Sequence, residues 1–207
     1  MILNTAVLNK VRGVTWSIDR EEMASTLVQR AQNGRPIRVP NYSQSLWKFV
    51  YRWGYIKDGF GANLPGNADT DLRTLWGQLL PLHGQAVNFL YQPPDSVVTN
   101  FALTVDASGN AEIVHNIAGY LESVQFLTNL VVYFNGLPQS SPMIAAPSTV
   151  PPYLGYVIQG IPSNTLVTVS FTYFYLCMLS GDQREYEFFM QGLAKLKSDL
   201  PFEQVRV

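Results

Sequence analysis

Apolar and polar residues alternate along much of this chain, and the pattern predicts a protein built mainly from β-strands. The clearest example is 167–176 (VTVSFTYFYL), where Thr or Ser alternates with Val, Phe and Tyr. Residues 46–56 (LWKFVYRWGYI) alternate large apolar side chains with Lys48 and Arg52, which is typical of a strand with one buried face. With the tryptophan of a helix described next, the aromatic residues expected in the core are Trp47, Phe49, Tyr51, Trp53 and Trp76.

Helical periodicity occurs in two segments. At about 69–82, leucines recur on one face, a capping residue precedes the first turn, and Pro81 and Gly84 follow the end. The second segment, 186–197, carries apolar residues at the spacing of a helix face. We therefore expect one flanking helix in the first half of the chain, and a C-terminal helix followed by a strand at 202–207.

A β-hairpin is predicted between residues 25 and 41. Segments 25–31 and 35–41 flank Asn33-Gly34, a dipeptide that accepts a positive φ at both central positions of a two-residue turn. Pro36 cannot donate a hydrogen bond to a neighbouring strand, so it would face an unpaired edge.

Three arginines lie on this predicted hairpin, and they have two interpretations. Arg30, Arg35 and Arg38 either form a solvated basic face or reach a neighbouring subunit and pair with acids there. On the second interpretation, the hairpin with Asn33 and Gly34 at its turn is a candidate interface between subunits.

The distribution of charge divides the chain into three parts. Residues 1–73 hold ten Lys or Arg against six acids, residues 74–183 hold none against five, and residues 184–207 hold four of each. Average composition implies roughly one basic residue in eight, so a long segment without any is unusual. This middle part also carries most of the prolines and several short predicted strands, at 97–105, 112–117, 130–134 and 154–158.

These patterns predict a mainly β fold with a minor helical part. Residues 1–95 would form the first part of one domain, which includes the helix at about 69–82 and which the resemblance described below implies to be half of a β-sandwich. Residues 96–165 would form a β-rich insertion or accessory subdomain. Residues 166–207 would complete the first domain with a strand, a helix and a strand.

Composition argues against several functional classes. With 47% hydrophobic residues, 14% charged residues and a net charge of −1, the chain is neither typical of disorder nor of a freestanding nucleic-acid binder. Its single cysteine, Cys177, excludes a disulfide framework and is expected to be a buried thiol. Residues 1–9 lack the features of a secretory signal, and the apolar stretch 166–180 is too short to span a bilayer, so we expect neither export nor membrane insertion.

No set of side chains predicts catalysis, a cofactor or a metal site. We expect His83 to be a turn residue at the helix end and His115 a strand-surface residue. The acids are also interpreted structurally. Those at 19–22 would lie in a solvated turn, Asp69 and Asp71 at a helix N-terminus, and 106–110 in a hairpin turn that lacks the further ligands of a calcium loop.

A series of short motifs runs through the chain in order. The first half contains Trp16, Asn33-Gly34-Arg35, Leu46-Trp47-Lys48-Phe49, Leu72-Arg73-Thr74-Leu75, His83-Gly84-Gln85, Asn88-Phe89-Leu90-Tyr91 and Pro94-Asp95. The second half contains Asp106-Ala107-Ser108-Gly109, Tyr133-Phe134-Asn135-Gly136, Phe171-Thr172-Tyr173-Phe174-Tyr175, Tyr186-Glu187-Phe188-Phe189-Met190 and Leu196-Lys197-Ser198. In this order and spacing, the motifs resemble those of distal tail proteins from long-tailed bacteriophages and gene transfer agents.

The resemblance implies a structural role rather than an enzymatic one. Such proteins have a fold similar to the tail-tube protein, a β-sandwich with a long hairpin and a flanking helix. They assemble as a hexameric ring between the tail tube and the hub or baseplate that carries fibres and receptor-binding proteins. The expected partners are therefore further copies of the chain, the tail tube protein, and hub and fibre proteins, with DNA only passing through the lumen. The expected location is the tail tip of the virion, after synthesis in the host bacterial cytoplasm.

A carbohydrate-binding module is the alternative function from a different class. In that case the β-rich middle section would hold a sugar of the host surface against exposed aromatic side chains. The candidate contacts are Tyr120, Tyr153 and Tyr156.

Overall fold

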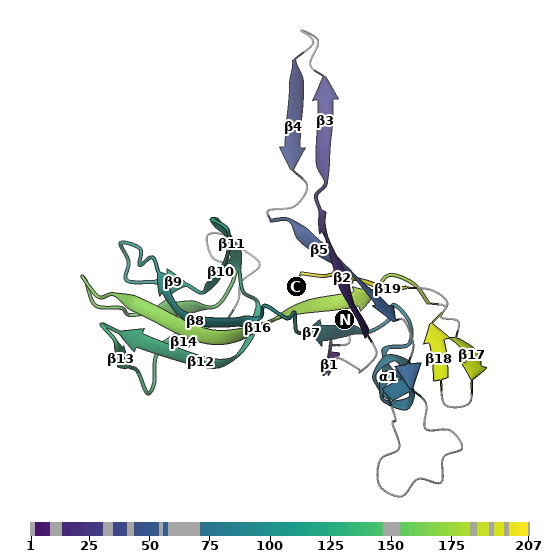
Figure 1. Ribbon diagram of the computed structural model, residues 1–207. Helices are drawn as coiled ribbons and strands as arrows, with labels where there is room; N and C mark the ends of the chain where they lie inside the picture. Colours follow the sequence, from purple (N-terminus) through teal and green to yellow (C-terminus); the bar gives the residue numbers. More distant parts are fainter. Residues whose placement is uncertain are drawn as a thin grey trace, which may run out of the picture. The chain divides into compact units, whose positions relative to one another are not determined.

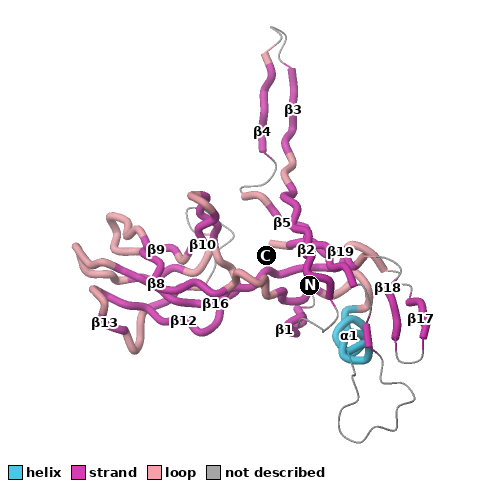
Figure 2. Tube along the Cα trace, in the orientation of Figure 1, coloured by secondary structure: helices cyan, strands magenta, loops and turns pink. Residues whose placement is uncertain are grey.

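The computed structural model describes residues 3–8, 14–30, 35–40, 44–53, 56–57, 71–146, 154–182, 186–190, 193–196 and 199–206 (Figure 1). These residues form a mainly β fold with one short α-helix, as predicted (Figure 2). The chain divides into two compact units, Met1–Leu90 with Leu176–Arg206, and Tyr91–Tyr175. The domain boundaries predicted from the sequence lie after residues 95 and 165, whereas the boundaries between the two units lie after residues 90 and 175. Among the described residues, no helix is long and apolar enough to cross a membrane.

The first unit is organised around a sheet whose core is aromatic. In spatial order its strands are β1 (Leu3–Leu8), β7 (Asn88–Tyr91), β16 (Val167–Leu179), β19 (Leu200–Gln204), β5 (Leu46–Trp53) and β2 (Val14–Met23). The ring centroid of Phe202 lies 5.4 Å from that of Phe49, 5.2 Å from that of Tyr51 and 5.6 Å from that of Phe89. All four rings are buried, so the face predicted for β5 is the core face.

The tryptophans are less buried than predicted. Trp47 and Trp76 are only half-buried, and the side chain of Trp53 lies outside the described residues. The guanidinium of Arg20 lies over the Trp47 ring, 3.9 Å from its centroid, which explains why this ring is covered by a cation rather than by apolar atoms.

The helix of the first unit is confirmed. Helix α1 (Asp71–Leu79) continues into the 3-10 helix η1 (Leu80–Leu82), and the chain leaves it at His83 with φ of 47°. The leucines at helical spacing bury one face, namely Leu72, Leu75, Leu79 and Leu82.

The predicted C-terminal helix is wrong. Strands β17 (Tyr186–Met190) and β18 (Leu193–Leu196) occupy this segment, and β18 also pairs with β6 (Ile56–Lys57). The segment YEFFM is rich in aromatic residues, which favour strands, and its apolar residues fit a period of two as well as a helix. Pairing of β18 with a strand almost 140 residues earlier decides between the two, and a local pattern does not contain that information.

The second unit consists of strands that pair with β16, a separate hairpin and a small sheet. Strands β8 (Val97–Leu103) and β12 (Phe126–Phe134) flank β16, and β13 (Leu137–Pro138) pairs with β12. A hairpin of β10 (Val114–Ile117) and β11 (Tyr120–Ser123) and a small sheet complete the unit, the latter consisting of β14 (Met143–Ala145), β15 (Val157–Gln159) and β9 (Ala111–Glu112). The odd-numbered residues of β16 are all buried, as the alternation predicts.

Asparagines with positive φ interrupt both strands beside β16. Asn100 on β8 and Asn129 on β12 have φ of 49° and 54°, and both strands shift register at this level. Such bulges increase the local twist, and on the edge strand β8 they disfavour pairing with another chain. The backbone N–H of Asn100 donates to Ser170 Oγ at 2.9 Å, which compensates the lost ladder bond.

Candidate functional site

The described residues contain no group of three or more His, Cys, Asp or Glu side chains that could hold a metal ion. His83 is an exposed residue at the end of η1, as predicted. Cys177 is fully buried, and burial raises the pKa of its thiol well above the ordinary value. A protonated, inaccessible thiol is a poor nucleophile, so this residue belongs to the core.

The second unit contains a buried polar network that the sequence patterns do not predict. Glu122 is 2% exposed and accepts a hydrogen bond from the Tyr175 hydroxyl at 2.9 Å. His115 lies opposite Glu122 on the paired strand, and its ring is 4.4 Å from that of Tyr173. His115 is therefore half-buried against an aromatic ring rather than on the strand surface as predicted. The missed signal is an acid in a segment without Lys or Arg, which needs a neutral donor such as tyrosine once it is buried.

Two cavities of the second unit are lined by acids that already hold backbone groups. They have volumes of about 590 and 290 Å³, and Asp106 lines both, while Glu112 lines the smaller. One oxygen of Asp106 accepts the N–H groups of Ser108 and Asn110, and one oxygen of Glu112 accepts those of Leu154 and Gly155. These contacts shape loops. The turn at 106–110 joins β8 to β9, which pair with β16 and β15, so it does not connect a hairpin as predicted.

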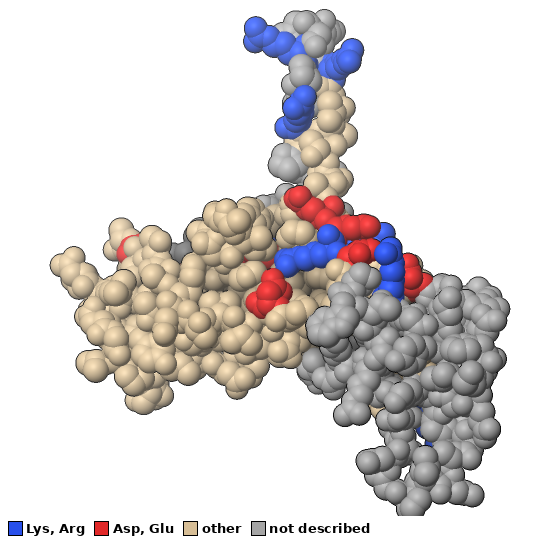
Figure 3. Space-filling view, viewed as in Figure 1, with Lys and Arg blue, Asp and Glu red and all other residues tan. Residues whose placement is uncertain are grey.

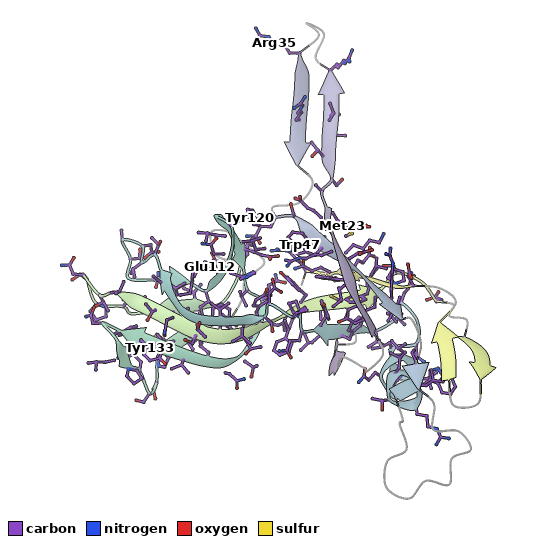
Figure 4. The ribbon with its side chains drawn as sticks, viewed as in Figure 1. Met23, Arg35, Trp47, Glu112, Tyr120 and Tyr133 are labelled. Carbon is purple, nitrogen blue, oxygen red and sulfur yellow. The ribbon has the colours of Figure 1, made fainter. Side chains whose placement is uncertain are left out.

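The predicted hairpin at 25–41 is present as strands β3 (Thr26–Arg30) and β4 (Pro36–Pro40), which we call the arm. The two strands pair with each other from Thr26–Pro40 to Arg30–Pro36, and with no other described strand. The turn residues Asn33 and Gly34 lie outside the described residues. Exposed Arg35 stands at the far end of the arm (Figures 1 and 4).

The register gives the arm two different faces. Leu27 and Val39 are directly opposite one another on one face, whereas Val28, Arg30 and Arg38 lie on the other. All five side chains are exposed. Neither Arg30 nor Arg38 makes an ion pair with another described residue. The arm therefore presents an apolar face and a basic face, both uncovered in the single chain.

The solvated turn predicted for the acids at 19–22 is wrong, because these residues lie on strand β2. There Glu21 lies opposite Lys48 of β5, and Asp19 lies opposite Val50 and diagonal to Arg52, so the attraction between these side chains supports the pairing of the strands. Arg52 bridges two acids, with 2.7 Å to an Asp19 oxygen and 3.2 Å to an Asp199 oxygen. The overlooked signal is that Asp19 and Glu21 are two residues apart and Lys48 and Arg52 four residues apart, so each pair falls on one face of its strand.

A second set of one cation and two acids lies on the same face, with its members directly opposite one another. Lys48 lies opposite Glu21 on β2 and opposite Glu203 on β19, and its Nζ is 3.4 Å from a Glu21 oxygen. We call the rows Asp19–Arg52–Asp199 and Glu21–Lys48–Glu203 the acid rungs. They contain four carboxylates and two cations, hence a formal charge of −2. Positive and negative side chains meet near the base of the arm in Figure 3.

The tyrosines proposed as sugar contacts are not brought together. Tyr120, 44% exposed, begins β11 at the turn of its hairpin (Figure 4). Tyr156 is half-buried and donates its backbone N–H to Val124, just beyond the other end of β11. Four residues of strand separate the two positions by about 13 Å. Tyr153 lies outside the described residues.

The arm and the acid rungs are thus the main candidate functional surfaces. The described side chains of both surfaces are exposed or half-buried. In comparisons with known proteins, no family model matches the chain and no curated protein is significantly similar to it.

Proposed function

We propose that this protein is a structural component of a bacteriophage tail tip, where copies of the chain form a ring that joins the tail tube to the hub. The observation that carries this proposal is the arm, which is exposed along both faces. A two-stranded ribbon is only marginally stable alone in water. Leu27, Val28 and Val39 are 48%, 57% and 50% exposed, so covering the arm with a partner would stabilise it.

The second unit supports the same proposal through its charge. Residues 91–175 contain no Lys or Arg, and their acids are Asp95, Asp106, Glu112 and Glu122. A neutral or weakly acidic surface does not retain the phosphate backbone of DNA. A lumen lined by such residues would let DNA pass without binding it.

The partners in this proposal are further copies of the chain in a ring, expected to be a hexamer, with the tail tube protein on one side and the hub, baseplate and fibre proteins on the other. The site of action is the tail tip of the virion. The carbohydrate-binding alternative stays a prediction. It gains no support from the two described tyrosines, which do not form one stacking surface.

Light scattering together with negative-stain electron microscopy tests this function. The purified chain is expected to give a mass several times 23.2 kDa and ring-shaped particles with a central channel. Replacing 26–40 with a short Gly-Ser linker should abolish the rings and leave the fold intact, because the arm pairs with no other described strand. A single-chain mass at every concentration, without rings, would contradict the proposal.

A further inference from the structure

The basic face of the arm and the acid rungs have matching spacings. Arg30 and Arg38 are diagonal neighbours in the arm, because Arg38 is opposite Val28, two residues before Arg30. Diagonal neighbours are about 7–8 Å apart. The β2 carboxylates of the two rungs, Asp19 and Glu21, are two residues apart on one face of the strand, which corresponds to about 7 Å, whereas the cations Lys48 and Arg52 are four residues apart on β5.

The charges of the two surfaces also match. Each acid rung holds two carboxylates and one cation, so each rung has a surplus charge of −1. Arg52 pairs with both acids of its rung, whereas Lys48 pairs with Glu21 and lies opposite Glu203. Three of the four carboxylates are clearly accessible, with side-chain exposures of 37% for Asp19, 58% for Glu21 and 50% for Asp199. One additional cation for each rung would neutralise the face. Arg30 and Arg38 supply two.

These partners do not meet within one chain. Arg30 follows Glu21 by nine positions, and of the eight residues between them only Ala24 and Ser25 lie outside strands β2 and β3. At strand rise this path is about 30 Å long. The arm therefore carries its arginines away from the rungs of its own chain and toward those of another.

We propose that the arm of one copy lies across the acid rungs of the next copy, with Arg30 and Arg38 each completing one rung. This inference rests on the proposed ring and names its contact. A contact between two different surfaces repeats from copy to copy and closes into a ring when the rotation allows it. Exposed ion pairs are individually weak, so the contact depends on several charges acting together and weakens with salt.

Charge exchange between copies tests the contact. One variant carries Arg30→Glu and Arg38→Glu on the arm, which changes these two sites from +2 to −2. A second carries Asp19→Lys and Glu21→Lys, which changes each rung from −1 to +1. Arg73→Glu on α1 is the matched control, because this exposed residue lies on neither surface. Circular dichroism and the urea midpoint verify folding, and Asp19→Asn with Glu21→Gln replaces the second variant if the lysines prevent folding.

Light scattering measures the mass of each variant and of their equimolar mixture. Each variant alone is expected to need at least tenfold more protein to associate, while the Arg73→Glu control assembles like the wild type. Mixing the two reversed variants, or combining all four substitutions in one chain, is expected to restore assembly. In the neutralised variant, weaker association is expected.

Three results separate the possibilities. Assembly of either reversed variant at the wild-type concentration, or failure of both the mixture and the fourfold variant to assemble, would overturn this contact while leaving the wild-type ring and the proposed function in place. Restored stability in the fourfold variant without a change of mass would place the contact within one chain and also overturn it. A wild-type chain that never associates would instead contradict the proposed function itself.

Discussion

The two units differ in the charge of an outward sheet face, which is charged in the first unit and uncharged in the second. In the first unit, the face of β2, β5 and β19 carries the acid rungs, in which every charge has a neighbour of opposite sign. In the second unit, the even-numbered residues of β16 lie with their register partners on a face without any charge. Its members are Thr168, Ser170, Thr172 and Phe174 on β16, Val97 and Ala102 on β8, and Phe126, Thr128, Val131 and Tyr133 on β12.

This difference shows that the low charge content of the chain is a regional property. Hydroxyl groups and half-buried rings cover the sheet of the second unit, whereas salt bridges cover that of the first. Electrostatic attraction to a partner is therefore concentrated in the first unit, where the arm also lies. Changes of salt should affect contacts of the first unit much more than contacts of the second.

The largest expected effect distinguishes the two sides of β16 in the second unit. Phe171→Ala should lower the free energy of unfolding by about 3–5 kcal/mol, because Phe171 is 2% exposed and its removal leaves a cavity. Thr172→Ala, its neighbour on the uncharged face, should cost less than about 1 kcal/mol. Equilibrium unfolding in urea measures both values. Equal costs would mean that the uncharged face is packed as tightly as the core.

The buried carboxylate of the second unit gives the next effect. Tyr175→Phe removes the hydroxyl that donates to Glu122 and should destabilise the protein by about 1–3 kcal/mol. Glu122→Gln keeps an acceptor for this hydroxyl and should cost less. Urea unfolding of the two variants tests the order. A neutral Tyr175→Phe variant would show that the hydrogen bond is replaced by another donor.

The buried thiol of β16 gives a pH-dependent effect in the first unit. Because burial raises the pKa of Cys177, the thiol stabilises the fold fully below its ordinary pKa of 9.0, and this contribution is lost as the pH rises above that value. The difference in unfolding free energy between wild type and Cys177→Ala should shift against the wild type by up to about 1.4 kcal/mol per pH unit above 9. A difference that is constant between pH 7.5 and 10 would contradict this.

The smallest effect on stability is expected at the acid rungs. Arg52→Gln should change the unfolding free energy by no more than about 1 kcal/mol, since its ion pairs are about half exposed. It should nevertheless strengthen association between copies at low salt, because the face becomes more acidic. Light scattering at two salt concentrations measures this change. Weaker association at low salt would argue that Arg52 itself contacts the partner.

Local patterns account for the elements that were predicted correctly. The helix α1 has leucines on one face and a proline and a glycine after its end, and the arm has a turn dipeptide between short strands. The alternation of β16 identifies its buried residues directly. In these segments, periodicity and turn chemistry agree with the final fold.

The wrong and missing predictions depend on contacts distant in sequence. The segment 186–197 pairs with β6, and Lys48 lies opposite Glu203, 155 residues later. The acid rungs exist only because three strands align in one register, which no single segment encodes. The burial of Glu122 likewise depends on Tyr175, 53 residues away.

Chemical cross-linking between the arm and the face of the acid rungs tests the central claim most directly. Val28 lies opposite Arg38 on the basic face of the arm, and Pro201 lies between Asp199 and Glu203 on the face of the rungs, so replacing them keeps every charge of the contact. Cysteines introduced as Val28→Cys and Pro201→Cys in the same chain can be joined by a short bis-maleimide, and the buried thiol of Cys177 does not compete. We expect a denaturing gel of the double-cysteine chain to show a ladder of covalent oligomers that ends at the size of the ring. Each single-cysteine variant should give no species larger than a dimer. A double-cysteine chain that stays monomeric, although the wild type assembles, would contradict the account.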